Sequence, residues 1–151
     1  MWFNPIMIWI LRSPFHSLVS KNIMLISVQG RKSGKLYTTP VNYRQISENG
    51  KVSLFTTSYR QRTWWRNLRG GARVSVRIRG RDLPAQSQLV DQHDEVAREM
   101  ELYFHCAPEM ARYFRVRLQP DGTPVFDDIN LAAQNLVVIK TTLAEDSISS
   151  G

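Results

Sequence analysis

The stretch 72–80 constrains the fold most strongly, because apolar and polar residues alternate strictly along it. The apolar positions are Val74, Val76 and Ile78, and three of the four polar positions, Arg73, Arg77 and Arg79, are arginines. Side chains alternate between the two faces of a β-strand, so this period of two places the apolar set on one face. The sequence therefore predicts a half-buried strand with a basic outer face.

Further short runs rich in β-branched and aromatic residues indicate more strands, at 22–28, 36–46, 52–57, 83–90 and 136–142. The turn 30–34 and the pair Asn49-Gly50 separate the first three runs, as in successive hairpins. Pro40 cannot donate to the hydrogen-bond ladder, which predicts an edge strand, a bulge or a barrel corner there. Six or so antiparallel strands with few helices favour a small barrel, mainly β with flanking helices, over an alternating β-α-β sheet.

Short helices are expected between some of these strands. Thr63 can cap a helix of about two turns that Gly70-Gly71 ends, a second helix is expected over 91–100, and Asp128 can cap a third through Ala133. No repeat or linker divides the 151 residues, so we expect a single domain over 1–151. Its ends are expected to be an N-terminal helix within 1–20 and a loose tail over 144–151.

The chain has one cysteine, Cys106, which cannot form an internal disulfide or a cysteine-type zinc site. This usage is typical of a cytoplasmic protein without a bound metal. The apolar N-terminal run is interrupted by Arg12 and Pro14, far short of the roughly 20 apolar residues of a membrane-spanning helix. We expect this helix to pack on the domain or on a partner subunit, or to contact a membrane surface through residues 2–18.

Positive charge is concentrated in the middle of the sequence. Thirteen of the 20 Lys and Arg residues lie between Arg31 and Arg81, where Glu48 is the one acidic residue. Such a distribution indicates that this third of the chain faces an anion. One interpretation is a small anionic ligand; the other is a binding module that tracks a nucleic-acid backbone through Arg73, Arg77 and Arg79.

Two motifs could hold a small, flat anion. The turn Gly30-Arg31-Lys32-Ser33-Gly34 offers backbone amides, a hydroxyl and two cations within five residues, which suits a phosphate, although an isolated match also fits a solvated hairpin turn. The stretch 56–68 runs from three hydroxyl residues into a loop and helix rich in Arg and Trp. Aromatic faces and guanidinium groups together suit a flat anionic ligand, while a tryptophan here also fits a core position.

The stretch 24–43, followed by Trp64-Trp65-Arg66-Asn67-Leu68, resembles the deazaflavin-dependent nitroreductase and quinone reductase family. The resemblance implies a split β-barrel similar to FMN-binding and pyridoxamine-phosphate-oxidase-like proteins. It also implies an oxidoreductase that binds coenzyme F-420, with FMN as the alternative. Such an enzyme transfers hydride from the reduced deazaflavin to a flat acceptor such as a quinone or a nitro compound. Relatives with this fold are often homodimers, and we expect the same here.

The resemblance also implies which residues contact the cofactor. Its phosphate would lie on Arg31, Lys32 and Ser33 and its ring system along Thr56, Thr57 and Ser58. The strand residues Thr38, Thr39 and Pro40 and the helix residues Trp65 and Asn67 would complete the cofactor site. Tyr59 or Tyr113 would donate the proton that accompanies the hydride. The loop 58–62 is shorter and more basic than in many relatives, and Met110 replaces a tyrosine of the nitro-reducing ones.

Outside this family, two classes remain open: the nucleic-acid-binding module and a protein that binds a lipid surface through its N-terminal helix. The positive charge flanks a motif suited to a small polyanion, so we expect no specific nucleic-acid partner.

Overall fold

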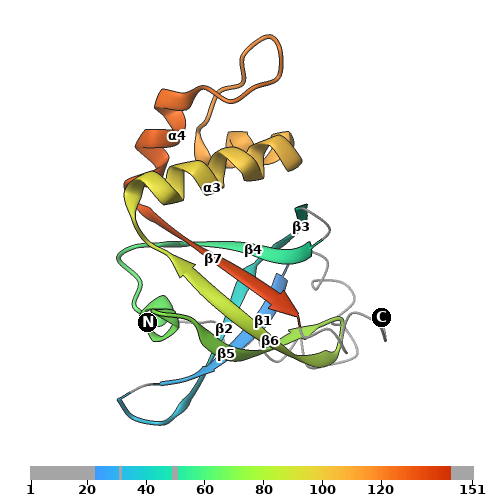
Figure 1. Cartoon of the computed structure of the whole chain (residues 1–151), viewed down its shortest axis with the longest axis vertical. Coiled ribbons are helices and arrows are strands. Elements are labelled where there is room, and N and C mark those ends of the chain that lie inside the picture. The colour runs from blue at the N-terminus through green and yellow to red at the C-terminus, as the bar shows by residue number, and fades with distance from the viewer. Residues whose placement is uncertain (1–22, 31, 49–50, 144–151) are drawn as a thin grey trace.

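The computed structural model describes residues 23–30, 32–48 and 51–143 (Figure 1). The helix expected within 1–20, the tail expected over 144–151 and Arg31 lie outside the described residues. Within the described ranges, no helix combines the length and apolar character that crossing a membrane requires.

Seven strands form one antiparallel sheet in the order β2-β1-β5-β6-β7-β4-β3. The strands are β1 Ile23–Gln29, β2 Leu36–Asn42, β3 Arg44–Glu48, β4 Lys51–Tyr59, β5 Ala72–Ile78, β6 Arg81–Val90 and β7 Leu136–Leu143. The helices are α3 His93–Cys106 and α4 Phe126–Ala133, and the short 3-10 helices are η1 Trp64–Leu68 and η2 Pro108–Phe114. The predicted mainly β fold with flanking helices is confirmed, with seven strands in place of six or so.

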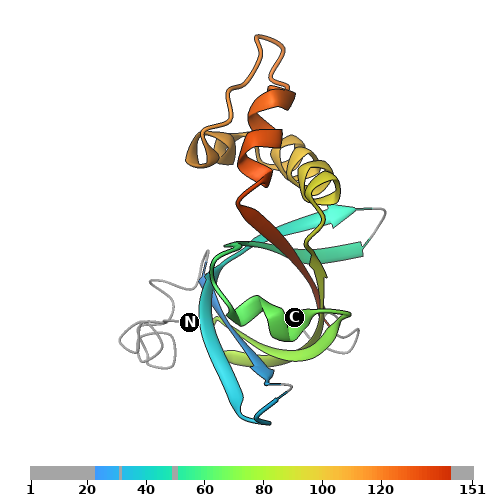
Figure 2. The ribbon, with the colours of Figure 1, turned by 90° about the vertical axis from the view of Figure 1, so that its left-hand side faces the viewer.

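The two edge strands of the sheet are consecutive in the chain, because only Tyr43 separates β2 from β3. A flat sheet could not place consecutive strands at its opposite edges, so the sheet curls until its edges meet at Tyr43. Figure 2 shows the resulting ring of strands with η1 inside its outline. This arrangement is a split β-barrel. The prediction of a single strand over 36–46 is therefore wrong. The segment forms two strands, β2 and β3, and the chain passes from one half of the barrel to the other at Tyr43.

Two local expectations are confirmed. Pro40 lies in the edge strand β2, which pairs with β1 on one side only. Proline has no N–H to donate, and an edge strand tolerates this because its other side forms no hydrogen bonds with a neighbouring strand. In β5, Val74 and Val76 are buried, whereas Arg73 before them and Ser75 between them are exposed, as the alternation predicts; Arg77 and Ile78 are both half-buried.

A helical cap, defined as residues 91–135, sits on one end of the barrel and contains α3, η2 and α4 (Figure 1). The described residues therefore form two apolar cores, one inside the barrel and one beneath the cap. The strand β4 contributes to both, because Leu54 belongs to the barrel core and its neighbour Phe55 to the cap core. The Phe55 ring stacks on Tyr103 of α3, with centroids 4.3 Å apart and planes at 9°.

Two ion pairs join the cap to the barrel beside that stack. Arg44 Nη2 of β3 lies 2.6 Å from Glu109 Oε1 of η2, and Lys140 Nζ of β7 lies 3.2 Å from Glu99 Oε2 of α3. Burial raises the pKa of Tyr103 above its usual value. The cap is thus fixed to the strands from which the site described next is built.

The helices differ from expectation at their starts. The segment after Thr63 forms the five-residue η1, not a two-turn helix, and the Thr63 side chain makes no capping bond. Gly70 and Gly71 both have positive φ, as predicted for the end of that segment. The last helix begins at Phe126, so Asp128 lies in its first turn and not at its cap. The Asp128 carboxylate binds Arg117 instead.

Candidate functional site

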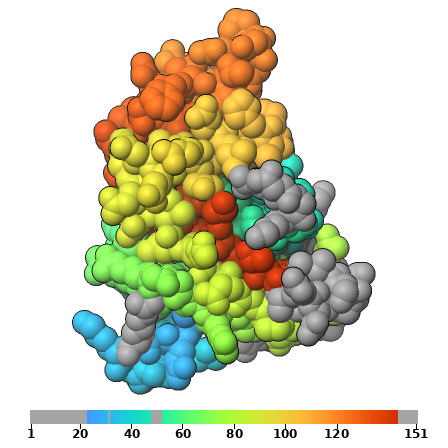
Figure 3. Space-filling model, in the orientation of Figure 1, coloured from blue at the N-terminus to red at the C-terminus, as the bar shows by residue number. Residues whose placement is uncertain are grey.

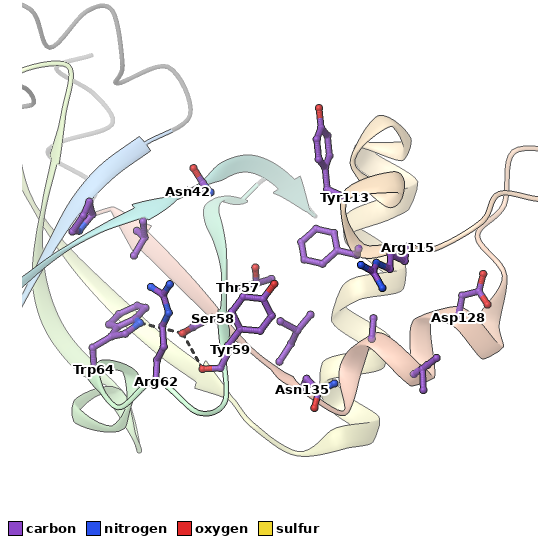
Figure 4. A pocket seen from close by; sticks show the side chains of 16 residues that line it. Asn42, Thr57, Ser58, Tyr59, Arg62, Trp64, Tyr113, Arg115, Asp128 and Asn135 are labelled. Carbon is purple, nitrogen blue, oxygen red and sulfur yellow. Dashed lines mark hydrogen bonds between the residues drawn. The ribbon is translucent and has the colours of Figure 1, made fainter. Parts of the chain in front are cut away.

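A cavity of about 640 Å³ opens between the end of the barrel and the cap. Three parts of the chain line it: the end of β2, the end of β4 with the loop that follows, and the η2 and α4 side of the cap (Figure 4). Five residues that the sequence had singled out line this cavity together: Pro40, Thr57, Ser58, Tyr59 and Tyr113. Both polar and apolar side chains line it, which suits a flat molecule with polar edges.

At the end of β4, the alternation of the strand decides which side chains meet the cavity. Thr57 and Tyr59 share the face of Phe55, which points to the cap, whereas Ser58 shares the face of Leu54 and points to the barrel interior. The Ser58 hydroxyl accepts a bond from Trp64 Nε1 at 3.1 Å and donates to the Tyr59 carbonyl at 3.2 Å. A hydroxyl has one proton, so Ser58 keeps only acceptor capacity for a ligand. Of the two neighbouring hydroxyls Thr57 and Ser58 that line the cavity, Thr57 is the one that remains able to donate.

Two of the residues assigned to the cofactor face the barrel interior. Thr56 is 2% exposed and Trp65 is 3% exposed, and neither lines the cavity. Within the described part of the chain, Thr56 Oγ1 and Trp65 Nε1 are buried without a hydrogen-bond partner. The Trp65 ring is covered from outside by the guanidinium carbons of Arg66 and Arg69, at 5.8 and 5.4 Å from its centroid. Contact of Thr56 and Trp65 with a cofactor stays a prediction.

Trp64, the neighbour of Trp65, lines the cavity and was not among the residues assigned from the sequence. The pattern Trp64-Trp65 does not distinguish the two, because in a helix of one turn and a half either can face the core. The Asn67 side chain donates from Nδ2 to the Trp64 carbonyl oxygen at 3.5 Å. Asn67 therefore supports Trp64, and its assignment to the cofactor is untested.

The phosphate-type turn lies at the tip of the β1–β2 hairpin, at the end of the barrel opposite the cap (Figures 1 and 3). Backbone bonds from Gly30 N to Lys35 O, 2.7 Å, and from Gly34 N to Gly30 O, 2.9 Å, close the turn. A Cβ on Gly30 would overlap the Tyr37 ring, so any larger residue there would have to displace that ring. Lys32 and Ser33 are exposed at the tip.

The hairpin strand β2 connects that turn to the cavity. Pro40 is six residues beyond Gly34, which at about 3.3 Å per residue corresponds to roughly 20 Å. Between them, Thr38 Oγ1 lies 2.9 Å from Ser27 Oγ on β1, and Thr39 is buried. The structure therefore does not bring Lys32 and Ser33 together with the cavity residues in one compact pocket. A ligand that used both would have to extend along β2.

The two candidate proton donors differ in their surroundings. In Figure 4 the Tyr59 hydroxyl points towards Thr57 and the space between β4 and the cap, whereas the Tyr113 ring extends away from both. The Tyr113 hydroxyl accepts a bond from Arg112 Nη2 at 3.0 Å, and the Arg112 guanidinium lies 4.9 Å from the Tyr113 ring centroid. Both tyrosines are more than half exposed, at 56% for Tyr59 and 64% for Tyr113.

The cavity is electropositive. Its one lining carboxylate, Asp128, is held by Arg117 through Nε at 2.8 Å and Nη2 at 3.1 Å. These hydrogen bonds lower the pKa of Asp128. Two lining arginines, Arg62 and Arg115, form no ion pair with an acidic residue in the part of the chain that the structure describes. Within the same ranges, no cluster of His, Cys, Asp and Glu is arranged to hold a metal ion.

The fold and the cavity together define a split-barrel domain with a cationic, partly aromatic cleft. The model of the F420H2-dependent quinone reductase family matches residues 14–120, and the chain belongs to that family. It is therefore an oxidoreductase of the kind that transfers hydride from reduced F-420 to quinone-like acceptors.

Several solved structures show a weak likeness. A chain described as a domain-swapped dimer is 21% identical, with 81% of each chain covered and a TM-score of 0.45. An F420-H2 dependent reductase, FDR-A, is 20% identical, with 80% of this chain and 94% of that chain covered and a TM-score of 0.42. The protein Atu2129 of Agrobacterium tumefaciens, of unknown function, is 17% identical, with 87% and 55% covered and a TM-score of 0.43. No curated protein is significantly similar in sequence.

Proposed function

We propose that the cavity is the place where the acceptor meets the F-420 ring, with the ring against the ends of β2 and β4 and the acceptor beneath the cap. One observation carries this proposal. Pro40 and Thr57 come from two motifs far apart in the sequence, yet they line the same cavity as Tyr113 of the cap. When bound, F-420 supplies the hydride, and the protein contributes binding, orientation and the exclusion of water.

The residues present fit an elongated anionic cofactor. The cationic turn and the cavity lie roughly 20 Å apart along β2. In FMN and in F-420 alike, a ribityl chain separates the ring from the first phosphate, so with its ring at the cavity FMN would leave the turn unused. F-420 continues beyond its phosphodiester into a carboxylate tail and can occupy both. Thr57 would donate to a polar edge of the ring, while Lys32 and Ser33, with Arg31, would bind the anionic part.

Tyr59 is the better placed of the two proposed proton donors. Reduction of a quinone to a hydroquinone takes one hydride, which brings two electrons, and one proton. The Tyr59 hydroxyl faces the cavity and has no hydrogen-bond partner among the described residues. Tyr113 would then act chiefly as part of the cavity wall.

Anaerobic titration and turnover with purified protein test this proposal. The protein is titrated with F-420 by fluorescence, and oxidation of reduced F-420 by a naphthoquinone is followed by absorbance. Thr57→Val should weaken F-420 binding, and Tyr59→Phe should lower kcat about 10²-fold or more, as for loss of a positioned acid, with little change in F-420 binding. Ser75→Ala on the exposed face of β5 is the matched control. Full activity of both variants would remove the cavity from the reaction.

Two further expectations belong to this proposal. The homodimer predicted from the resemblance is tested by light scattering of the purified protein, and a monomer at all concentrations would contradict it. We also expect a cytoplasmic protein whose residues 2–18 contact a membrane surface. Co-sedimentation with vesicles of anionic lipid tests this contact. A variant lacking residues 1–20 is the control, and equal sedimentation of both would contradict the contact.

A further inference from the structure

The cap side of the cavity presents a single cation beside an aromatic and apolar wall. Arg115 lines the cavity next to Phe114, and Leu131 of α4 lies on the same side. Leu131 is 65% exposed, so this wall is open to a ligand. A flat ring that packs on this wall would have Arg115 at its edge.

The guanidinium of Arg115 has no anionic partner among the described residues, although a carboxylate lines the same cavity. That carboxylate, Asp128, already receives two side-chain bonds and one backbone bond, all from Arg117. Arg117 thus neutralises Asp128 from outside. The positive charge of Arg115 is left for something that enters the cavity.

The backbone at Arg115 is also unusual. Its φ of 59° is left-handed, at the end of η2, where glycine is the ordinary residue because it has no Cβ. The turn is closed by bonds from Arg115 N to Arg112 O, 3.2 Å, and from Val116 N to Ala111 O, 3.0 Å. A long cationic side chain at a position that favours glycine points to a role for that side chain.

We propose that Arg115 makes this enzyme selective for flat acceptors that carry a carboxylate, which the guanidinium binds through two parallel hydrogen bonds. The inference rests on the function proposed above and adds the chemical class of the acceptor. Arg62, on the opposite side of the cavity in Figure 4 and beside Trp64, lies on the side assigned to the F-420 ring. The two arginines therefore have different expected ligands.

A pair of acceptors that differ in charge alone tests the proposal: a 1,4-naphthoquinone with a propionate side chain, and its methyl ester. Binding is measured without cofactor by quenching of tryptophan fluorescence, because Trp64 lines the cavity. The protein should bind the acid at least tenfold more tightly than the ester. Arg115→Gln and Arg115→Gly should bring that ratio close to one, and Arg115→Lys should retain part of it.

The glycine variant relieves the left-handed backbone, so it stays folded even if the glutamine variant does not. Arg98→Gln, an equal loss of charge on the exposed side of α3 and outside the cavity lining, should keep the full ratio. An unchanged ratio in Arg115→Gly overturns the proposal. If the affinity of this variant for F-420 also falls while the ratio is unchanged, Arg115 binds the cofactor and not the acceptor.

Turnover with reduced F-420 separates this inference from the function on which it depends. If neither quinone is reduced while the acid still binds preferentially through Arg115, the anion site stands and the proposed reaction fails. If both quinones are reduced with equal kcat/KM and Arg115→Gly changes neither, the reaction stands and the selectivity is overturned.

Discussion

The bond between Ser58 and Trp64 joins the barrel interior to the cavity, and its removal has a calculable cost. Trp64 is 3% exposed, and its Nε1 donates to Ser58 Oγ at 3.1 Å. In Ser58→Ala this N–H would stay buried without an acceptor, which costs about 1 to 3 kcal/mol. For a chain of this length, each kcal/mol lowers Tm by about 2 to 4 °C, so we expect a decrease of roughly 2 to 12 °C.

A double-mutant cycle separates this bond from lost packing. Trp64→Phe removes the donor and part of the ring, and the double variant contains neither partner. The Ser58→Ala variant contains an unsatisfied N–H that is absent from the double variant. The loss of unfolding free energy in the double variant should therefore be smaller than the sum of the losses in the two single variants by about 1 to 3 kcal/mol. Urea unfolding of the four proteins gives these values. Additivity within about 0.5 kcal/mol would refute the reasoning, because independent sites behave in that way.

Four other predictions follow from the site and the charge. Replacing Arg31 and Lys32 together by Ala should weaken F-420 binding by about 2 to 5 kcal/mol in a fluorescence titration without unfolding the protein; an unchanged Kd would exclude the turn. F-420 should bind more tightly than FMN at low salt, with a smaller advantage as salt is raised, and FMN copurifying with the protein would contradict this. Binding to DNA should remain weak at about 0.15 M salt, and a salt slope equivalent to six or more phosphates would favour a nucleic-acid module. Hydrogen bonds from Arg117 lower the pKa of Asp128, so the pair stabilises the fold in full above about pH 4, the ordinary pKa of an aspartate, and this stability is lost as the pH falls through the lowered pKa. The stability difference between the protein and Asp128→Asn should therefore shrink on acidification below about pH 4, and a difference that grows on acidification would contradict the assignment.

The strand pattern could be predicted from the sequence because it depends on local alternation. Val74 and Val76 are buried as their spacing indicates. The division of 36–46 into β2 and β3 could not be predicted, because the bend occurs at Tyr43 without a glycine or proline, three residues after Pro40. Closure of the barrel causes that bend, and closure depends on pairings between strands far apart in the chain.

Part of the site was equally inaccessible to local reasoning. Thr57, Tyr59 and Pro40 belong to motifs with recognisable residue types, and they do line the cavity. Arg115 directly follows η2 and Leu131 lies in α4, in segments without a recognisable motif, and only the packing of the cap brings them to the cavity. The burial of Thr56 and the inward direction of Ser58 follow from the phase of β4, which its run of three hydroxyl residues does not reveal.

The cap is one continuous segment placed between neighbouring strands. β6 ends at Val90, β7 begins at Leu136, and Val90 pairs directly with Val138. A short hairpin loop could connect these strands without any change in the strand order. Residues 91–135 can therefore be exchanged as a cassette, in evolution or in the laboratory, while β1, β2 and the turn between them stay as they are. On the function proposed above, the acceptor side of the cavity and the cofactor turn are thus encoded by separate segments of the chain.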